Sequence, residues 1–234
     1  MNWKTLLSRS YSPNSNNPAA AIIEADNGLF YPGVRIENIS HPLTITAVQA
    51  AAFSALADGA IPEVLYLPDN TPEPLTEFWI NEYDLKKGGN SFPDSASFYD
   101  PVLADNTDIN IELKELTVRS VIPNSDFPVT ALLEVEFGFI PGVNVECSAW
   151  NLGLCAERVA VLRALSSGYR EFKSIWIYAP KADFVSPCGA CRQVLSEWMN
   201  QQKVHLNHGD GSSSSLIFSH LLPYGFTSSS LRKK

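Results

Sequence analysis

The residues best suited to chemistry are four cysteines, all in the second half of the chain, at 147, 155, 188 and 191. Their clustering indicates metal or redox chemistry rather than a disulfide framework. Cys188 and Cys191 are separated by two residues, so both can reach one metal from the start of a helix. Together with Cys155, three thiolates can fill three corners of a tetrahedral zinc site and leave the fourth for water.

A glutamate and two arginines stand next to these cysteines in the sequence. Glu157 lies two residues past Cys155, so we expect it beside the metal without being a ligand, as a general acid/base must be. Arg158 follows Glu157, and Arg192 follows Cys191. Their guanidinium groups can hydrogen-bond the sulfurs and offset the negative charge of three thiolates. The alternative for both arginines is a solvated position on the surface.

Two other interpretations of the cysteines remain open. A lone Cys-x-x-Cys can be redox-active or belong to a structural zinc site, but a structural site normally shows a fourth Cys or His at a suitable spacing. Cys147 is a possible fourth ligand, although its expected place on a strand favours a small buried hydrophobe. The histidines, at 41, 205, 208 and 220, show no ligand spacing with the cysteines.

A tandem repeat organises the elements that would position these residues. Residues 13–18 read Pro-Asn-Ser-Asn-Asn-Pro, and residues 123–128 read Pro-Asn-Ser-Asp-Phe-Pro. Residues 32–37 read Pro-Gly-Val-Arg-Ile-Glu, and residues 141–146 read Pro-Gly-Val-Asn-Val-Glu. Two hexamers repeated in the same order and at nearly the same spacing indicate a duplicated module of about 110 residues, an ordinary domain size.

Each copy shows the same order of predicted elements: a short helix, a β-hairpin, an Ala-rich helix, a buried strand and a further helix. The first copy places them at 2–9, 18–25 with 29–37, 45–58, 64–67 and 74–83. The second copy places them at 112–120, 128–135 with 139–147, 154–167, 175–178 and 189–199. The order predicts an α/β fold of two tandem α/β/α modules, each a mixed β-sheet packed with helices.

The two copies differ at the positions that could do chemistry. The first copy has Thr-Ala-Val at 46–48 where the second has Cys-Ala-Glu at 155–157, and it has no counterpart of Cys188 and Cys191. We therefore expect a degenerate, non-catalytic module over residues 1–84 and a catalytic module over residues 111–234. Residues 85–110 are rich in Gly, Asn, Asp, Ser and Pro, which is typical of a linker or a long excursion.

Composition excludes several classes of protein. The chain of 234 residues is 45% hydrophobic, which is enough for a substantial core. A net charge of −8 disfavours a nucleic-acid partner. No apolar run reaches the roughly 18 residues that a membrane span requires, and the first residues do not resemble a signal peptide. We therefore expect a cytoplasmic protein with neither a nucleic-acid nor a membrane partner.

Three segments together resemble the cytidine deaminase family, in the form that holds its metal with three cysteines. They read Asn-Val-Glu at 144–146, Leu-Cys-Ala-Glu-Arg at 154–158 and Pro-Cys-Gly-Ala-Cys-Arg-Gln at 187–193. The resemblance covers nearly all of the second copy and extends more weakly to the first. It implies one Zn²⁺ per chain on Cys155, Cys188 and Cys191, with Glu157 as the proton-transferring residue.

The resemblance also implies which residues bind the substrate, a cytidine or deoxycytidine nucleoside. In this family the Asn-x-Glu pair binds the ribose 3′-hydroxyl, which corresponds to Asn144 and Glu146 here. The backbone around Ala156 and Ser186 would hold the edge of the base. Phe127 would pack against the nucleoside; its alternative is a plain core position.

The closing segment and the assembly are expected to follow the family as well. Phe226 resembles the C-terminal phenylalanine that reaches the active site of a neighbouring module. The family combines four modules, so a chain with two modules would form a homodimer. Three features depart from the usual pattern: Trp150 replaces a tyrosine, Cys147 replaces an asparagine, and the silent module comes first.

The expected reaction is hydrolysis of the nucleoside to uridine or deoxyuridine and ammonia, as in pyrimidine salvage. One alternative is deamination of another aminopyrimidine nucleoside or of a cytosine-containing antibiotic. A second alternative is a catalytically dead, zinc-stabilised nucleoside-binding protein. Glu157 discriminates against the dead protein, because a purely structural zinc site does not need it.

Overall fold

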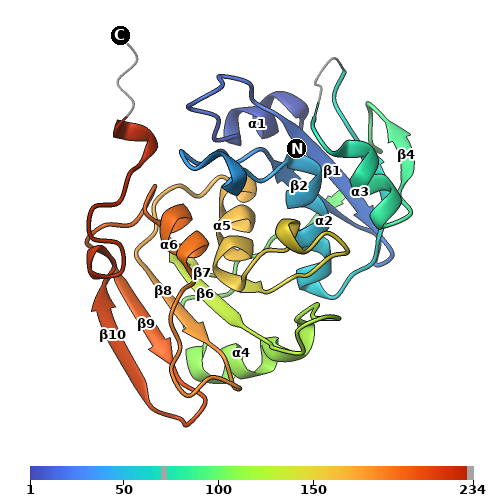
Figure 1. Ribbon diagram of the computed structural model, residues 1–234. Helices are drawn as coiled ribbons and strands as arrows, with labels where there is room; N and C mark the ends of the chain where they lie inside the picture. The colour runs from blue at the N-terminus through green and yellow to red at the C-terminus, as the bar shows by residue number, and fades with distance from the viewer. Residues whose placement is uncertain (70–72, 231–234) are drawn as a thin grey trace.

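Two five-stranded sheets and the helices packed on them form the protein. The computed structural model describes residues 1–69 and 73–230 (Figure 1). The first sheet has the order β4 (Lys86–Gly89), β3 (Pro62–Tyr66), β1 (Ala20–Ala25), β2 (Leu29–Val34), β5 (Ser97–Phe98). The second has the order β10 (Ser213–Ile217), β9 (Lys203–Asn207), β8 (Ser174–Tyr178), β6 (Thr130–Val135), β7 (Gly138–Val143). Each sheet is mixed and carries helices, so the predicted α/β class is confirmed.

The two sheets share a pattern of pairing. In the first sheet β1 is antiparallel to both β2 and β3, and β3 is parallel to β4. In the second sheet β6 is antiparallel to both β7 and β8, and β8 is parallel to β9. The parallel pairs follow from crossovers that contain a helix, α3 (Thr76–Glu82) in the first case and α6 (Gly189–Leu195) in the second.

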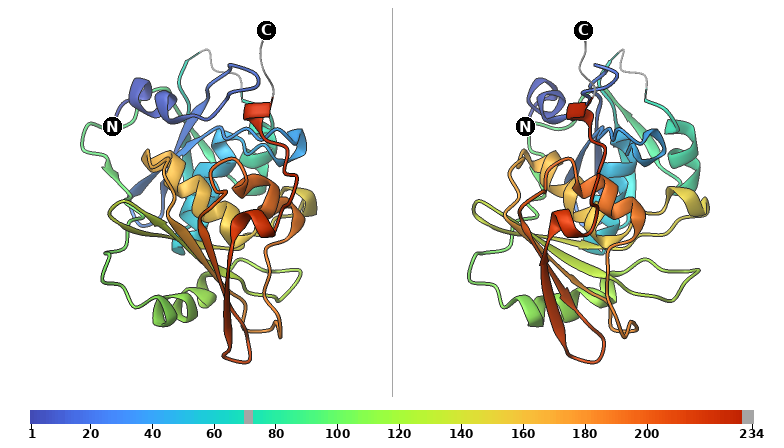
Figure 2. Two further views of the ribbon diagram at one scale, coloured as in Figure 1. Left: turned by 90° about the vertical axis from the view of Figure 1, so that its left-hand side faces the viewer. Right: turned by 60° about the vertical axis from the view of Figure 1, so that its left-hand side comes forward.

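Two long helices, α2 (Ala47–Asp58) and α5 (Ala156–Ser167), pack side by side between the sheets (Figures 1 and 2). Almost every residue of both helices is buried. Small alanine side chains allow each helix to contact its own sheet and the other helix. Helix α1 (Trp3–Arg9) packs on the first sheet, and α4 (Ile109–Glu115) packs on β6 and β8 of the second.

A glycine in each sheet sets how closely the central helix approaches. A Cβ on Gly142 in β7 would lie 2.2 Å from the Ala156 carbonyl oxygen, and a Cβ on Gly33 in β2 would lie 2.3 Å from that of Ala47. Only glycine permits such an approach. The repeated Pro-Gly pair therefore seats the first turn of α5, and with it the residues at its start, directly against the sheet.

Both central helices end where the sequence predicts. Each stops at a glycine in the left-handed region, Gly59 at φ 84° and Gly168 at φ 101°, which satisfies the last helical carbonyls. Other boundaries differ. The helix expected at 112–120 begins at Ile109 and tightens into a 3₁₀ turn at Leu116–Arg119. The residues 85–110, expected as a linker or excursion, contribute β4 and β5 to the edges of the first sheet.

Arg163 of α5 ties the two halves together at the centre. Its side chain is fully buried and donates to the Pro141 carbonyl at 2.8 Å and to the Tyr99 hydroxyl at 2.7 Å. It also lies 3.8 Å from the carboxylate of Asp58 in α2. A hydrophobic core cluster includes residues of both sheets, and Tyr99 packs against a smaller cluster of buried residues in the first half. Among the helices that the structure describes, none is long and apolar enough to cross a membrane.

Candidate active site

Cys155, Cys188 and Cys191 meet in space. Their sulfur atoms all lie within 4.8 Å of one another, and the Sγ atoms of Cys155 and Cys188 are 3.7 Å apart. Cys191 is buried, Cys155 is partly exposed and Cys188 is exposed, so the cluster faces outward on one side. Cys147 lies outside the cluster: it is buried, and its thiol contacts the Ala149 carbonyl at 3.2 Å.

The starts of two helices position these cysteines. Cys155 is the N-cap residue of α5 and Cys188 is the N-cap residue of α6. The Cys188 sulfur accepts a bond from the Cys191 amide at 3.5 Å, as an N-cap side chain does. Free N–H groups and the positive end of the helix dipole favour thiolates at both places. The sequence therefore builds the cluster from helix N-termini, as predicted from the cysteine spacing.

The donor set fits Zn²⁺. Hydrogen bonds from the Cys155 and Cys191 thiols lower the pKa of Cys188, so one thiolate forms readily. The bond to Cys188, with burial, raises the pKa of Cys155, and the bonds to Cys155 and Cys188, with burial, raise the pKa of Cys191. A metal that binds here must therefore displace protons from those two thiols, as zinc does. Three sulfur ligands and one outward-facing position match a zinc site that performs chemistry rather than a closed structural site.

Glu157 stands beside the cysteines in the first turn of α5. The residue is only 3% exposed, and its Oε2 atom is buried without a hydrogen-bond partner. Burial raises the pKa of the carboxyl to about 7, and the negative charge of Cys188 acts in the same direction. A buried carboxyl with a free oxygen can take and return a proton near neutral pH.

A pocket of about 450 Å³ opens next to the cluster. It brings Phe127, Asn144 and Glu146 together with Cys155 and Trp150. The other residues that line it are Ser125, Val129, Val145, Gly153 and Leu154. The size and the mixture of apolar walls with a few polar groups suit a small organic ligand.

Comparisons with known proteins agree with this geometry. Residues 110–206 match the family model described as the cytidine and deoxycytidylate deaminase zinc-binding region. The cytidine deaminase of Sporosarcina psychrophila is 40% identical over 122 residues, 51% of this chain and 90% of its own length. That of Halalkalibacterium halodurans is 40% identical over 108 residues, 45% of this chain and 82% of its own length. The chain belongs to the cytidine deaminase family.

A solved structure was matched as well. The cytidine deaminase from Burkholderia pseudomallei is 34% identical and superposes with a TM-score of 0.47, over 49% of this chain and 93% of that chain. The family match places Cys155, Cys188 and Cys191 inside the zinc-binding region, so the cofactor of this cytidine deaminase family member is Zn²⁺.

The two arginines of this family member have partners other than the sulfurs. Arg158 is buried and donates to the Leu43 carbonyl at 3.0 Å, while its Nε atom has no partner. Arg192 donates to the Pro187 carbonyl and to the Ser186 hydroxyl, both at 2.8 Å. Arg158 therefore joins the cluster to the first half of the chain, and Arg192 braces the turn before Cys188. Neither is a free surface arginine.

Asn144 and Glu146 hold the loop that carries Phe127. The Asn144 side chain accepts from the Val129 amide and donates to the Phe127 carbonyl, each at 2.9 Å. Glu146 accepts from the amides of Asn124 and Ser125 and from the Ser125 hydroxyl. Burial of Glu146 acts to raise its pKa, but these hydrogen bonds outweigh it and leave the pKa lowered. Glu146 is thus a preformed, ionised acceptor at the pocket.

The remaining predicted residues lie around this centre in different ways. Ala156 is buried at the start of α5, and Ser186 is exposed beside Arg192. Phe226 is 53% exposed, and its carbonyl accepts from Gln193 at 2.6 Å. Neither Ser186 nor Phe226 is among the described residues that line the pocket in the same chain.

The place in the first half that matches the start of α5 is occupied by other side chains. Thr46, the counterpart of Cys155, accepts a bond from the buried indole of Trp79 at 3.1 Å. The Ala47 amide, the counterpart of the Ala156 amide, donates to the Glu73 carboxylate at 3.0 Å. Burial raises the pKa of Glu73, although the charge of Arg35 opposes this. Among the described residues, the first half therefore has no counterpart of the three-cysteine cluster, although a cavity of about 260 Å³ lies beside Ser15 and Glu37, the counterparts of Ser125 and Glu146.

Sequence reasoning missed the residues that reach the site from the first half. Leu43 contributes a carbonyl, which no side-chain motif reveals. Glu82 accepts from the Ser148 amide at 2.8 Å, a contact across 66 residues with no local signal. Ser125 could have been found, since it belongs to the repeated Pro-Asn-Ser turn, and Ser15 makes the matching contact with Glu37.

Proposed function

We propose that this chain is a zinc-dependent hydrolase that converts cytidine and deoxycytidine to the corresponding uridines and ammonia. The observation that carries the proposal is a buried glutamate with an unpartnered oxygen beside three clustered thiols. Its relatives named cytidine deaminase support the reaction, and the open pocket at Cys155 supports a small nucleoside substrate.

The protein residues divide the work of the reaction. When bound, Zn²⁺ supplies the Lewis acidity that lets water act as a nucleophile near neutral pH. Glu157 takes a proton from the attacking water as the new C–O bond forms at C4 of the pyrimidine, and it delivers that proton to N3. Glu157 then passes the second proton of the water to the amino group, the C4–N bond breaks, and ammonia leaves. Its raised pKa, about 7, suits both directions of transfer.

Other side chains bind and orient the nucleoside. Glu146 and Asn144 offer polar groups at the pocket that suit a ribose hydroxyl, and Phe127 offers an aromatic wall. The backbone at Ala156 and Ser186 would hold the edge of the base. Arg158 and Arg192 support the cysteine cluster through the bonds to Leu43 and Pro187. Phe226 lies away from the pocket of its own chain, so its role would be in a neighbouring one.

The assembly and the origin of the chain belong to the same proposal. Residues 111–234 would be the catalytic module and residues 1–84 a degenerate copy that arose by internal duplication, with 85–110 between them. The shared strand pairing and the repeated glycines support this. We infer a homodimer, because the large apolar side chains of Trp150, Phe184 and Phe226 are exposed in the single chain and a partner subunit would bury them. Free cysteines at the site suit the reducing cytoplasm.

Ultraviolet absorbance of the purified protein with cytidine tests the proposal. Conversion to uridine that stops on zinc chelation would support it. Other aminopyrimidine nucleosides and a cytosine-containing antibiotic belong in the same panel. Turnover of one of these without turnover of cytidine would replace the substrate, and tight nucleoside binding without any turnover would indicate a binding protein.

A further inference from the structure

Residues of the first half of the chain form hydrogen bonds with the loop that follows Glu146. Glu82, the last residue of α3, accepts from the Ser148 amide at 2.8 Å with one carboxylate oxygen and from the Ser148 hydroxyl with the other. Ser148 lies between Glu146 and Trp150, which both line the pocket. The contact joins a helix without metal ligands to a wall of the candidate active site.

The far end of the same loop is held from the same side. Gln49 of α2 donates its side-chain amide to the Leu152 carbonyl at 2.7 Å. Leu152 ends the 3₁₀ turn Trp150–Leu152, whose first residue is 66% exposed. The turn that presents the Trp150 side chain is therefore fixed at both ends by residues of the first half.

A matching hydrogen bond runs in the opposite direction, from the first half of the chain to a glutamate of the second half. Glu197, just past α6, accepts from the Ile39 amide at 3.3 Å. Ile39 occupies the place after Glu37 that Ser148 occupies after Glu146, so each half holds the matching loop of the other. The loop after Glu146 borders the pocket that Cys155 also lines, whereas the matching loop after Glu37 borders a smaller cavity of about 260 Å³.

The position of Glu82 in its own helix points the same way. A carboxylate at the C-terminal end of a helix is disfavoured by the helix dipole. Local helix stability therefore gives no reason for a glutamate at this place, whereas two bonds to Ser148 do. Bonds to an ionised acceptor are stronger than bonds between neutral groups, so the pair can restrain a surface loop.

We propose that Glu82 is a positioning residue for nucleoside binding: it fixes Ser148 and, through it, the turn that places Trp150 against the substrate. The first half of the chain then takes part in substrate binding without touching the reacting atoms. The kinetic part of this inference rests on the proposed function, but the restraint on the loop does not.

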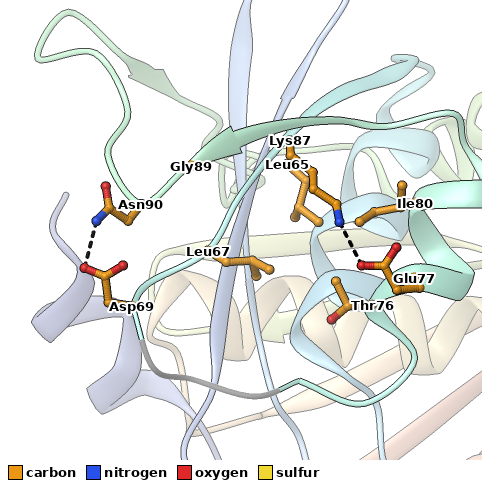
Figure 3. Close-up of a pocket in the computed structure, with 9 residues that line it drawn as sticks. All are labelled: Leu65, Leu67, Asp69, Thr76, Glu77, Ile80, Lys87, Gly89 and Asn90. Atoms are coloured by element: carbon orange, nitrogen blue, oxygen red, sulfur yellow. Dashed lines mark hydrogen bonds and ion pairs between the residues drawn. The ribbon is translucent and has the colours of Figure 1, made fainter.

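The test compares Glu82→Gln and Glu82→Ala in the full chain with Glu77→Gln as the matched control. Glu77 lies on the same helix, but its carboxylate pairs with Lys87 at 2.8 Å, and both residues line a cavity formed by α3, β3 and β4 (Figure 3). Glu82→Ala removes both bonds to Ser148, and because Ser148 does not itself touch the substrate only part of their stabilisation should appear in nucleoside binding. We therefore expect this variant to raise the KM for cytidine about fivefold and to change kcat less than about twofold. Glu82→Gln keeps one acceptor oxygen, so its KM should lie between those of the wild type and Glu82→Ala. The zinc content of both variants should equal that of the wild type.

Amide hydrogen exchange gives a readout that is independent of turnover. Peptides covering residues 146–153 should exchange faster in both Glu82 variants than in the wild type or in Glu77→Gln. If the wild type failed to deaminate cytidine, the proposed function would fall while the exchange result still judged the restraint. Unchanged exchange together with unchanged KM would overturn the inference, and so would a loss of zinc or of folding in Glu82→Gln, since that indicates a general structural role.

Discussion

At Gly142, strand β7 passes so close to helix α5 that a Cβ atom would lie 2.2 Å from the Ala156 carbonyl oxygen. The same approach leaves 2.6 Å to the Ala160 amide nitrogen. Because Cys155 and Glu157 flank Ala156, the packing of this one glycine sets where the metal ligand and the acid/base lie.

Replacing Gly142 by alanine should therefore disturb the metal centre. We expect Gly142→Ala to push the first turn of α5 outward, lower zinc affinity by at least about tenfold and abolish most turnover. Gly33→Ala is the matched control, because its Cβ would meet the Ala47 carbonyl oxygen at 2.3 Å in the half without ligands. Both variants should lose stability by about 1–3 kcal/mol from overpacking, but zinc content at limiting metal should fall only in Gly142→Ala.

Variants of the three clustered cysteines should contain less zinc than a variant of the fourth cysteine. Cys155→Ser or Cys191→Ser should leave well under one zinc per chain, because each removes one of three ligands. Cys147→Ser should keep full zinc, since its sulfur lies outside the cluster. Elemental analysis after dialysis measures all three. Full zinc in Cys191→Ser, or loss of zinc only in Cys147→Ser, would refute the ligand assignment.

The hydrogen bonds to Glu146 predict how nucleoside binding depends on pH. They leave the carboxyl pKa below its ordinary value of about 4.3. The ionised form therefore contributes its full stabilisation above that value and loses it only as the pH falls through the lowered pKa. Glu157, whose pKa is raised to about 7, titrates in the same range, so the measurement uses the Glu157→Gln variant. In that variant the Kd for uridine, followed by tryptophan fluorescence, should stay constant from pH 8 to about pH 5. Ser125→Ala should shift the weakening toward higher pH, and an unchanged profile would contradict this role of Ser125.

Arg163 should be a main determinant of stability. Its removal leaves the Pro141 carbonyl and the Asp58 carboxylate with one fewer partner in the core. We expect Arg163→Ala to lower the free energy of unfolding by about 3 kcal/mol. Arg119 also pairs with Asp58, at 3.4 Å, but is 45% exposed, so Arg119→Ala should cost less than about 1 kcal/mol. Equal effects in urea denaturation would show that burial is not the deciding factor.

The sequence predicts the parts of this fold that depend on local rules. The Ala-rich helices α2 and α5, which end at glycines, and the first strand of each hairpin agree with the structure within two residues. The second strands of the hairpins were expected to reach residues 37 and 147, but they end at Val34 and Val143. The cysteine cluster can also be predicted from the sequence, because the spacing of the cysteines places them at the starts of two expected helices. The hairpin of β9 and β10 was missed, since the serine run at 212–215 lacks the apolar alternation of a strand.

Contacts across the chain could not be predicted in this way. The spacing places Arg192 next to the cysteines, yet the carbonyl of Pro187 and the hydroxyl of Ser186 compete for its guanidinium. The hydrogen bond from Ser148 to Glu82 depends on how the two halves of the chain pack, and no sequence motif indicates that packing. Neighbouring residues in sequence thus indicate which groups gather at the site, while tertiary packing decides what each one binds.

The rate of cytidine deamination by the wild type and by Glu157→Gln, with zinc quantified in the same samples, separates proton transfer by Glu157 from zinc binding. The amide keeps the size of the side chain but cannot carry the proton. We expect conversion of cytidine to uridine by the wild type, a loss of about 10²–10⁴-fold in kcat for the variant, and one zinc per chain in both. Full turnover by zinc-loaded Glu157→Gln would remove this residue from the mechanism, and an inactive wild type with full zinc would contradict the assigned reaction.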